Sequence, residues 1–163
     1  MNEPMSPKLF ASIQAIAPEF VEVRHAIHAH PELAFEERKT SDLVAARLAA
    51  FGYEVHRGLG TTGVVGRIKK GRSQKSIGIR ADMDALPILE KTGLPYESTI
   101  PGKMHACGHD GHTAILLCAA KYLAESVEFD GVLNLIFQPA EENEGGALRM
   151  LEDGLFEKFP CDE

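Results

Sequence analysis

The spacing of apolar residues over the first third of the chain predicts helices. A first stripe at helical spacing consists of Leu9, Phe10, Ile13 and Ile16. Pro18 follows this stripe, and because the first turn of a helix accommodates proline, we expect a second helix to begin there. Pro31 disfavours helical geometry at His30, so the second helix should end at that point. A third helix should span residues 35–51, with Gly52 just after its end.

Further along the chain the pattern changes to the shorter period of strands. We predict strands at residues 53–57, 63–69, 76–82 and 131–138. An irregular stretch at 85–105 and a helix at 110–125 separate the third strand from the fourth, and because that helix is apolar nearly all round we expect it to be buried. A last helix should begin at Gly145 and end near Glu152. This alternation predicts an α/β fold in which helices flank a central mixed sheet.

Three glycines near the first strand imitate a nucleotide-binding fingerprint. Gly58, Gly60 and Gly63 match the pattern GxGxxG, and Asp82 and Asp84 follow at about the distance of a ribose-binding acid. The fingerprint requires a helix directly after the glycines, because the pyrophosphate lies at the N-terminus of that helix. Here the β-branched run VVGRIKK follows instead, so we interpret the glycines as a plain turn between strands.

Composition narrows the class of protein. The chain has 163 residues, of which 44% are hydrophobic and 25% charged, and this is typical of one globular domain. The net charge of −7 argues against a nucleic-acid partner. No apolar run is long enough to span a membrane, and no secretory signal is readable. Three cysteines without a CxxC pair indicate no disulfide framework and favour a cytoplasmic location.

The densest candidate chemistry lies in the run HACGHDGH at residues 105–112. Cys107 and His109 stand in a glycine-containing loop before a helix, and thiolate and imidazole are the strongest common ligands of zinc-like ions. We therefore predict a metal site, with a capping turn that holds a buried free cysteine as the alternative. A nucleophilic Cys107 with His109 as its base is a further alternative. His105 and His112 can either orient metal ligands or have structural roles.

Two pairs of carboxylates follow two of the predicted strands. Asp82 and Asp84 end the third strand, where residues two positions apart share a face. Glu141 and Glu142 follow the fourth strand through Pro139. Ligand sites of open α/β sheets lie at the carboxyl ends of strands, so both pairs can reach one cleft. One carboxylate there could hold a metal ion while its neighbour acts as a general base, and a solvated acidic loop is the alternative.

The other histidines and cysteines carry weaker signals. His25, His28 and His30 lie at helical spacing beside a charged helix end, which favours a surface or structural role. Cys118 falls within the apolar helix and is most simply a small core residue.

Four segments, taken in chain order, resemble one known family. They are HAHPELAFEERKT at 28–40, GIRADMDALPI at 78–88, GKMHACGHDGHTA at 102–114 and FQPAEENEGGA at 137–147. The resemblance is to the co-catalytic metallopeptidase superfamily of aminoacylases and carboxypeptidases. Within it, the chain is similar to the amidohydrolase branch that includes hippurate hydrolase, N-acyl-amino-acid amidohydrolases and plant auxin-conjugate hydrolases.

The resemblance implies a role for each residue of such a site. Cys107, His109 and Glu142 would be metal ligands. Glu141 would be the general base, and Asp84 would orient a ligand. The cofactors would be two divalent ions of zinc, manganese, cobalt or nickel. The reaction would be hydrolysis of the amide bond of a small N-acyl amino acid, which releases a carboxylate and a free amino acid.

The chain also departs from the family pattern. Family members are longer, and after the glutamate pair they supply a histidine ligand in an HxxP motif, a lid or dimerisation domain, and a returning segment with another histidine ligand. No histidine follows His112 here. Residues 1–163 would therefore be the N-terminal part of a zinc-peptidase-like catalytic domain, truncated before the lid domain and the C-terminal catalytic segment. The full-length relatives would be homo-oligomers.

This departure sets the expectation for activity. Three of the implied ligands are present for a site that should hold two ions, so we expect this polypeptide alone to be weakly active or inactive. A non-catalytic metal-binding remnant or an interaction module is the alternative function.

Overall fold

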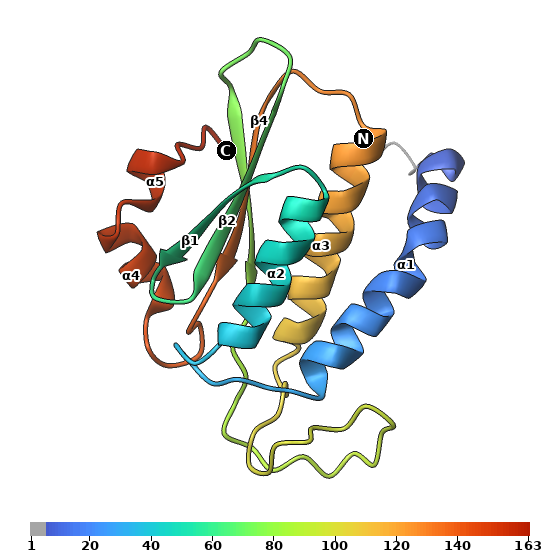
Figure 1. The fold of residues 1–163 in the computed structure, drawn as a ribbon, viewed down its shortest axis with the longest axis vertical. Coiled ribbons are helices and arrows are strands. Elements are labelled where there is room, and N and C mark those ends of the chain that lie inside the picture. The colour runs from blue at the N-terminus through green and yellow to red at the C-terminus, as the bar shows by residue number, and fades with distance from the viewer. Residues whose placement is uncertain (1–5) are drawn as a thin grey trace, which may run out of the picture.

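The computed structural model describes residues 6–163, and Figure 1 shows them as three layers. The middle layer is a sheet of four strands, β1 (Glu54–Leu59), β2 (Gly63–Lys70), β3 (Ser76–Asp82) and β4 (Gly131–Gln138). One face carries the long helices α1 (Pro7–His28), α2 (Arg38–Ala50) and α3 (His109–Ser126). The short helices α4 (Gly146–Glu152) and α5 (Leu155–Lys158) lie on the other face. These layers confirm the predicted α/β class.

The strands follow the order β1-β2-β4-β3, and the sheet is mixed as predicted. β2 pairs with β1 and with β4 in antiparallel fashion, whereas β3 and β4 are parallel, with Asp82 opposite Gln138. The β1–β2 hairpin contains the three glycines of the GxGxxG pattern, so their interpretation as a turn is confirmed. The parallel pair matters for function, because β3 and β4 both end at the same edge of the sheet.

Two apolar clusters, one on each face of the sheet, hold the layers together. The larger cluster lies under α1, α2 and α3, and its fully buried members include Leu48, Val64, Leu117, Leu135 and Phe137. The smaller cluster lies under α4 and α5 and consists of Leu59, Val65, Ile136, Met150, Leu155 and Phe159. Successive residues of a strand face opposite sides of the sheet, so β4 is buried along its whole length between the two clusters.

The structure corrects the first predicted elements, because α1 is one continuous helix and not two helices separated at Pro18. Pro18 lies inside α1 on its exposed side, where it lacks the N–H that would bond the carbonyl one turn earlier. The apolar stripe continues past it, and Phe20, Val23 and Ile27 are buried in the larger cluster. Packing of this stripe outweighs the local break, which costs about 3 kcal/mol in a helix interior.

α2, which corresponds to the third predicted helix, begins later than predicted and ends as predicted. Phe35 has a positive φ of 61°, so helical geometry starts only at Arg38. The carboxylate of Glu32 accepts hydrogen bonds from N–H groups of the first turn. At the other end, Gly52 has a φ of 87° and donates its N–H to the carbonyl of Ala49, which is the glycine-terminated ending that the sequence predicts.

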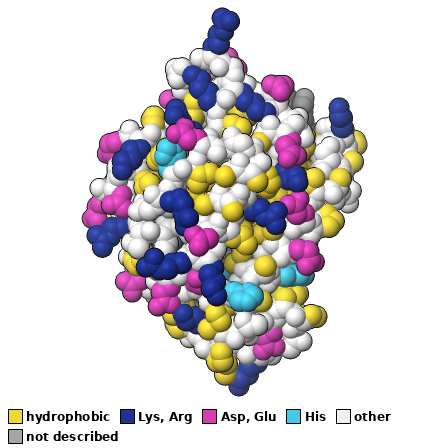
Figure 2. Space-filling view, viewed as in Figure 1, with side chains coloured by type: hydrophobic (Ala, Val, Ile, Leu, Met, Phe, Trp, Pro, Cys, Tyr) yellow, Lys and Arg dark blue, Asp and Glu magenta, His cyan; other side chains and the backbone are white. Residues whose placement is uncertain are grey.

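α3 is buried on one side only, so the expectation of a wholly buried helix is wrong. Leu117 and Ala120 are fully buried, whereas Ile115 is 68% exposed, because α3 belongs to an outer layer. The sequence did not indicate α5. Among the described residues, no helix is long and apolar enough to cross a membrane. Figure 2 shows acidic and basic side chains interspersed over the face in view, so the net charge is not gathered into one patch there.

Candidate active site

The carboxyl ends of β3 and β4 bring together the residues that the sequence singles out. Asp82 is the last residue of β3 and Asp84 follows it, and Glu141 and Glu142 follow β4. The loop before α3 and the first residue of α3 add Cys107 and His109. Gly108, between these two residues, has a φ of 92° and so adopts the left-handed conformation that glycine favours. This turn lets the thiol and the imidazole approach the same centre.

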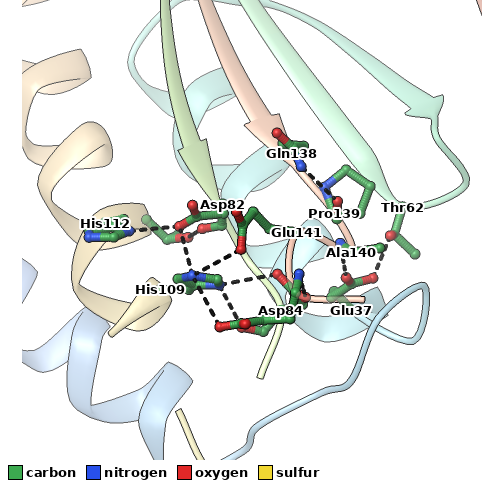
Figure 3. A network of polar contacts seen from close by, with 12 residues as sticks. Glu37, Thr62, Asp82, Asp84, His109, His112, Gln138, Pro139, Ala140 and Glu141 are labelled. Carbon is green, nitrogen blue, oxygen red and sulfur yellow. Dashed lines mark hydrogen bonds and ion pairs between the residues drawn. The ribbon is translucent and has the colours of Figure 1, made fainter. Parts of the chain in front are cut away.

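His109 lies at the middle of this group (Figure 3). Its Nδ1 lies 3.0 Å from the main-chain oxygen and 3.1 Å from the Oδ1 of Asp84, so the Nδ1–H donates to this residue. Its Nε2 then carries the lone pair, and it faces three carboxylates at 3.6 Å from Asp82, 3.7 Å from Glu142 and 3.9 Å from Glu141. A carboxylate on one ring nitrogen and a free lone pair on the other is the arrangement of a metal-binding histidine.

The donor atoms fit a divalent cation. Ligand atoms of Cys107, His109 and Glu142 all lie within 4.8 Å of one another, and those of Asp82, His109 and His112 do so as well. The Oε1 of Glu142 is buried without a hydrogen-bond partner among the described residues. Thiolate, imidazole and carboxylate are the ligands that zinc and neighbouring transition metals prefer. The residues present therefore match the predicted metal chemistry.

The electrostatics of the cluster also favour a cation. The nearby Glu142 carboxylate, partial desolvation, and the charges of Glu141 and Asp82 raise the pKa of the Cys107 thiol to about 11. A nucleophilic cysteine requires a lowered pKa, so these surroundings argue against a cysteine hydrolase that uses this thiol. A thiolate would form here only when a positive charge replaces the thiol proton.

His109 and Asp84 shift each other's pKa values through their hydrogen bond. Burial acts to lower the pKa of His109, but its bond to Asp84 and the surrounding carboxylates raise that pKa above its ordinary value. Burial likewise acts to raise the pKa of Asp84, and hydrogen bonds from His109 and from the N–H groups of Glu142 and Glu141 outweigh it, so this pKa is lowered. Asp84 therefore stays ionised and fixes the tautomer and orientation of the imidazole.

The two glutamates differ in accessibility. The side chain of Glu142 is 22% exposed, whereas that of Glu141 is 40% exposed. Figure 3 shows the Glu141 carboxylate directed toward His109 from the end of β4. An accessible carboxylate beside a cation-binding group can exchange protons with a water molecule, which is the geometry required of a general base.

The turn that carries the glutamates depends on a residue that the sequence did not single out. Ala140 is buried, has a positive φ of 51°, and donates its N–H to the Oε1 of Glu37 at 2.9 Å. Glu37 is fully buried, and its Oε2 accepts the hydroxyl hydrogen of Thr62 at 2.6 Å. Burial raises the pKa of Glu37, against the effect of these hydrogen bonds. Glu37 lies within the segment HAHPELAFEERKT, but nothing in that segment marks it as buried.

The two other histidines of the run HACGHDGH, His105 and His112, have different surroundings. The Nδ1 of His112 lies 2.7 Å from Asp82, which also forms an ion pair with Arg80 at 3.0 Å. His105 is buried, and neither of its ring nitrogens has a hydrogen-bond partner among the described residues. Burial is the main cause that lowers the pKa of His105 to about 4. His105 is therefore a neutral buried group near the site.

His28 is buried in a network that the sequence did not predict. Its Nδ1 lies 2.8 Å from Asp110 and its Nε2 lies 3.1 Å from Glu90, so both ring nitrogens meet carboxylates. Arg24 also donates to Asp110 at 3.0 Å. This network ties α1 to the start of α3 and to the irregular stretch, and it fits the structural role expected for this group. His30, by contrast, is exposed.

Comparisons with known proteins agree with this geometry. The model of peptidase family M20/M25/M40 matches residues 78–163. Hippurate hydrolase of Campylobacter jejuni is 60% identical over 94% of this chain, and IAA-amino acid hydrolase ILR1-like 5 of Arabidopsis thaliana is 45% identical over 93% of it. The solved structure of the Bacillus subtilis YXEP protein, a dinuclear metal binding peptidase, has a TM-score of 0.84 and 38% identity over 90% of this chain.

These matches cover only part of the relatives. The chain spans 40% of the Campylobacter hydrolase, 35% of the Arabidopsis hydrolase and 41% of the Bacillus chain. The similarity thus extends over nearly all of the present chain but over about two fifths of each relative.

Proposed function

The chain belongs to peptidase family M20/M25/M40, and from this premise we propose that it is part of a metal-dependent amidohydrolase acting on linear amides. The substrate would be a small N-acyl amino acid of the hippurate kind, and the products a carboxylate and a free amino acid. The names of the hippurate and IAA-amino acid hydrolases support this substrate class. Residues 1–163 would form the N-terminal part of the catalytic domain.

The described cysteines are all free, which supports a cytoplasmic location.

The arrangement of His109 is the observation that carries the proposal. Its Nδ1–H is held by Asp84, and its Nε2 faces the acidic centre beside Cys107 and Glu142. Cys107, His109 and Glu142 would hold one divalent ion, and the dinuclear relative supports a second one at this site. When bound, such ions would polarise the amide carbonyl and stabilise the negative charge that develops on its oxygen. The donor set admits zinc, manganese, cobalt or nickel.

Glu141 and Asp84 would have different roles in the reaction. Glu141 would accept a proton from the attacking water and later deliver it to the leaving amine. Asp84 would keep the imidazole of His109 in the metal-binding tautomer, and it also fixes the backbone of Glu142 through the N–H at 3.0 Å. The exposed side of Glu141 leaves room for the water and the substrate carbonyl.

The test separates the general base from the metal ligands. Glu141→Gln should retain bound metal, measured by elemental analysis, and should lose turnover of hippurate, measured with the 163-residue chain in excess over substrate so that weak activity is visible. Glu144→Gln changes an exposed neighbour of the same type and should alter neither quantity. Wild-type turnover in Glu141→Gln with intact metal content would refute the role of Glu141. Metal binding without any turnover in the unmodified chain would instead support a metal-binding module.

A further inference from the structure

We propose that Glu37 is a positioning residue for the glutamate pair, because its buried carboxylate fixes the backbone turn at Ala140 from which Glu141 and Glu142 project. This inference rests on the proposed function for the roles of the two glutamates. Its central observation is that the carboxylate of Glu37, just before α2, accepts one hydrogen bond from Thr62 in the β1–β2 turn and one from Ala140 after β4 (Figure 3).

The environment of Glu37 is unusual for a carboxylate. The residue is fully buried, and among the described residues its carboxylate pairs with no lysine, arginine or histidine. The hydroxyl of Thr62 lies at 2.6 Å and the backbone N–H of Ala140 at 2.9 Å from it, and the backbone N–H groups of Glu37 itself and of Phe35 also favour its ionised form. Burying a carboxylate without a cationic partner is costly, so a fold retains it where its hydrogen bonds serve another purpose.

The conformation of Ala140 indicates that purpose. A φ of 51° is unfavourable for a residue with a Cβ, and such strain persists only where the surroundings determine it. Glu37 holds the N–H of Ala140, and Gly146 donates its own N–H to the Ala140 carbonyl at 2.9 Å. Two residues later, Asp84 holds the N–H of Glu142 at 3.0 Å. These three hydrogen bonds hold the turn. Of the three, the bond to Glu37 is the one that connects the turn to the segment before α2.

Loss of the Glu37 bond should affect both glutamates. The buried N–H of Ala140 would have no acceptor, and the turn would relax toward a negative φ. Rotation at Ala140 changes the direction in which the following residues leave the strand, so Glu142 would move away from His109 and Cys107. Loss of a residue that positions metal ligands without binding the metal itself commonly lowers metal affinity by about 10- to 100-fold.

The experiment compares three variants of the 163-residue chain. Glu37→Met preserves the side-chain volume and removes the acceptor, whereas Glu37→Gln keeps an oxygen that can accept from Ala140. Glu32→Met is the matched control, because Glu32 also accepts backbone N–H groups at the start of α2 but does not contact the glutamate turn. The two measurements are hydrogen exchange of the Ala140 amide by NMR and titration with Co²⁺, read from its absorption with the Cys107 thiolate.

We expect Glu37→Met to speed exchange of the Ala140 amide and to weaken Co²⁺ binding by about 10- to 100-fold. Glu37→Gln should restore both properties to within a few-fold of the unmodified chain, and Glu32→Met should change neither, even if it lowers the melting temperature. Unchanged exchange and unchanged Co²⁺ affinity in folded Glu37→Met would overturn the proposal, as would an equal loss in Glu32→Met.

Two further points keep the proposal testable. If Glu37→Met does not fold, Thr62→Val removes the other bond to the carboxylate. It should then give a smaller change in the same direction, and no change would overturn the proposal. Because Co²⁺ binding and amide exchange do not depend on turnover, they test Glu37 even if Glu141→Gln shows that the proposed function is wrong.

Discussion

Acidification should destabilise the metal-free fold through His105. This residue is 4% exposed, and neither ring nitrogen has a hydrogen-bond partner among the described residues. Burial is the main cause that lowers its pKa to about 4, and the nearby His28 and His109 act in the same direction. In the unfolded chain the same imidazole should have a pKa of about 6.5.

The sign and size of the effect follow from this difference in pKa. Between about pH 6.5 and pH 4 the unfolded chain binds a proton at His105 that the folded chain does not, so the free energy of unfolding falls as the pH falls. Each pH unit within that interval is worth about 1.4 kcal/mol, which gives a loss of about 2 kcal/mol by about pH 5. His28 has a raised pKa, so its stabilising contribution is present below about pH 6.5 and is lost only as the pH rises through its folded value.

The assay is urea unfolding in the presence of a chelator, followed by circular dichroism at several pH values. His105→Gln removes the titrating group and keeps a polar side chain, so any constant cost of the substitution cancels when the pH dependence is compared. The unmodified chain should lose about 2 kcal/mol more than this variant between about pH 6.5 and about pH 5. All other titrating groups are shared by the two proteins. Parallel stability curves over this interval would refute the argument.

Three other changes test separate parts of the structure. Because the Cys107 thiol has a pKa of about 11, its proton must leave on metal binding. The thiol should therefore contribute about a tenfold rise in Zn²⁺ affinity per pH unit near neutrality in competition titrations, and Cys107→Ala should remove this contribution to the slope. Gly146→Ala would place its Cβ 1.8 Å from the oxygen of Pro139, so it should shift the glutamate turn and weaken Co²⁺ binding measured by titration. Pro18→Ala should raise the free energy of urea unfolding by about 1–2 kcal/mol, since it restores a helical N–H at an exposed position.

The sequence predicted the elements whose boundaries are set locally. The third and fourth strands were predicted at their observed limits, because each is an apolar or β-branched run bounded by turn residues. The division of the first helix at Pro18 was wrong for the opposite reason. Local chemistry disfavours proline inside a helix, but the buried stripe through Phe20, Val23 and Ile27 depends on α3 and the sheet, which local chemistry does not describe.

The same distinction applies to the site. Cys107 and His109 lie within one short run, and Glu141 and Glu142 are adjacent, so their types and spacing already indicated a metal centre. Glu37 had no such signal, because its partners lie 25 and 103 positions away along the chain. The fold alone makes it a neighbour of the glutamate turn. Long-range hydrogen bonds of this kind are the part of a site that motif spacing cannot show.

The charge balance of the centre explains why the fold can keep so many acids together. Asp82, Asp84, Glu141 and Glu142 surround the imidazole of His109, and Asp82 also contacts that of His112. Among the described residues, Arg80 is the only arginine or lysine that forms an ion pair with any of these four acids. The fold stabilises one of these acids, Asp84, with backbone N–H donors. Such donors hold the carboxylates in place but do not neutralise them, so the excess negative charge of the carboxylates around the Nε2 of His109 remains. A divalent cation would remove that excess and use the same lone pairs, so the acidic cluster would act as a preformed binding site and the bound ions would contribute to its stability.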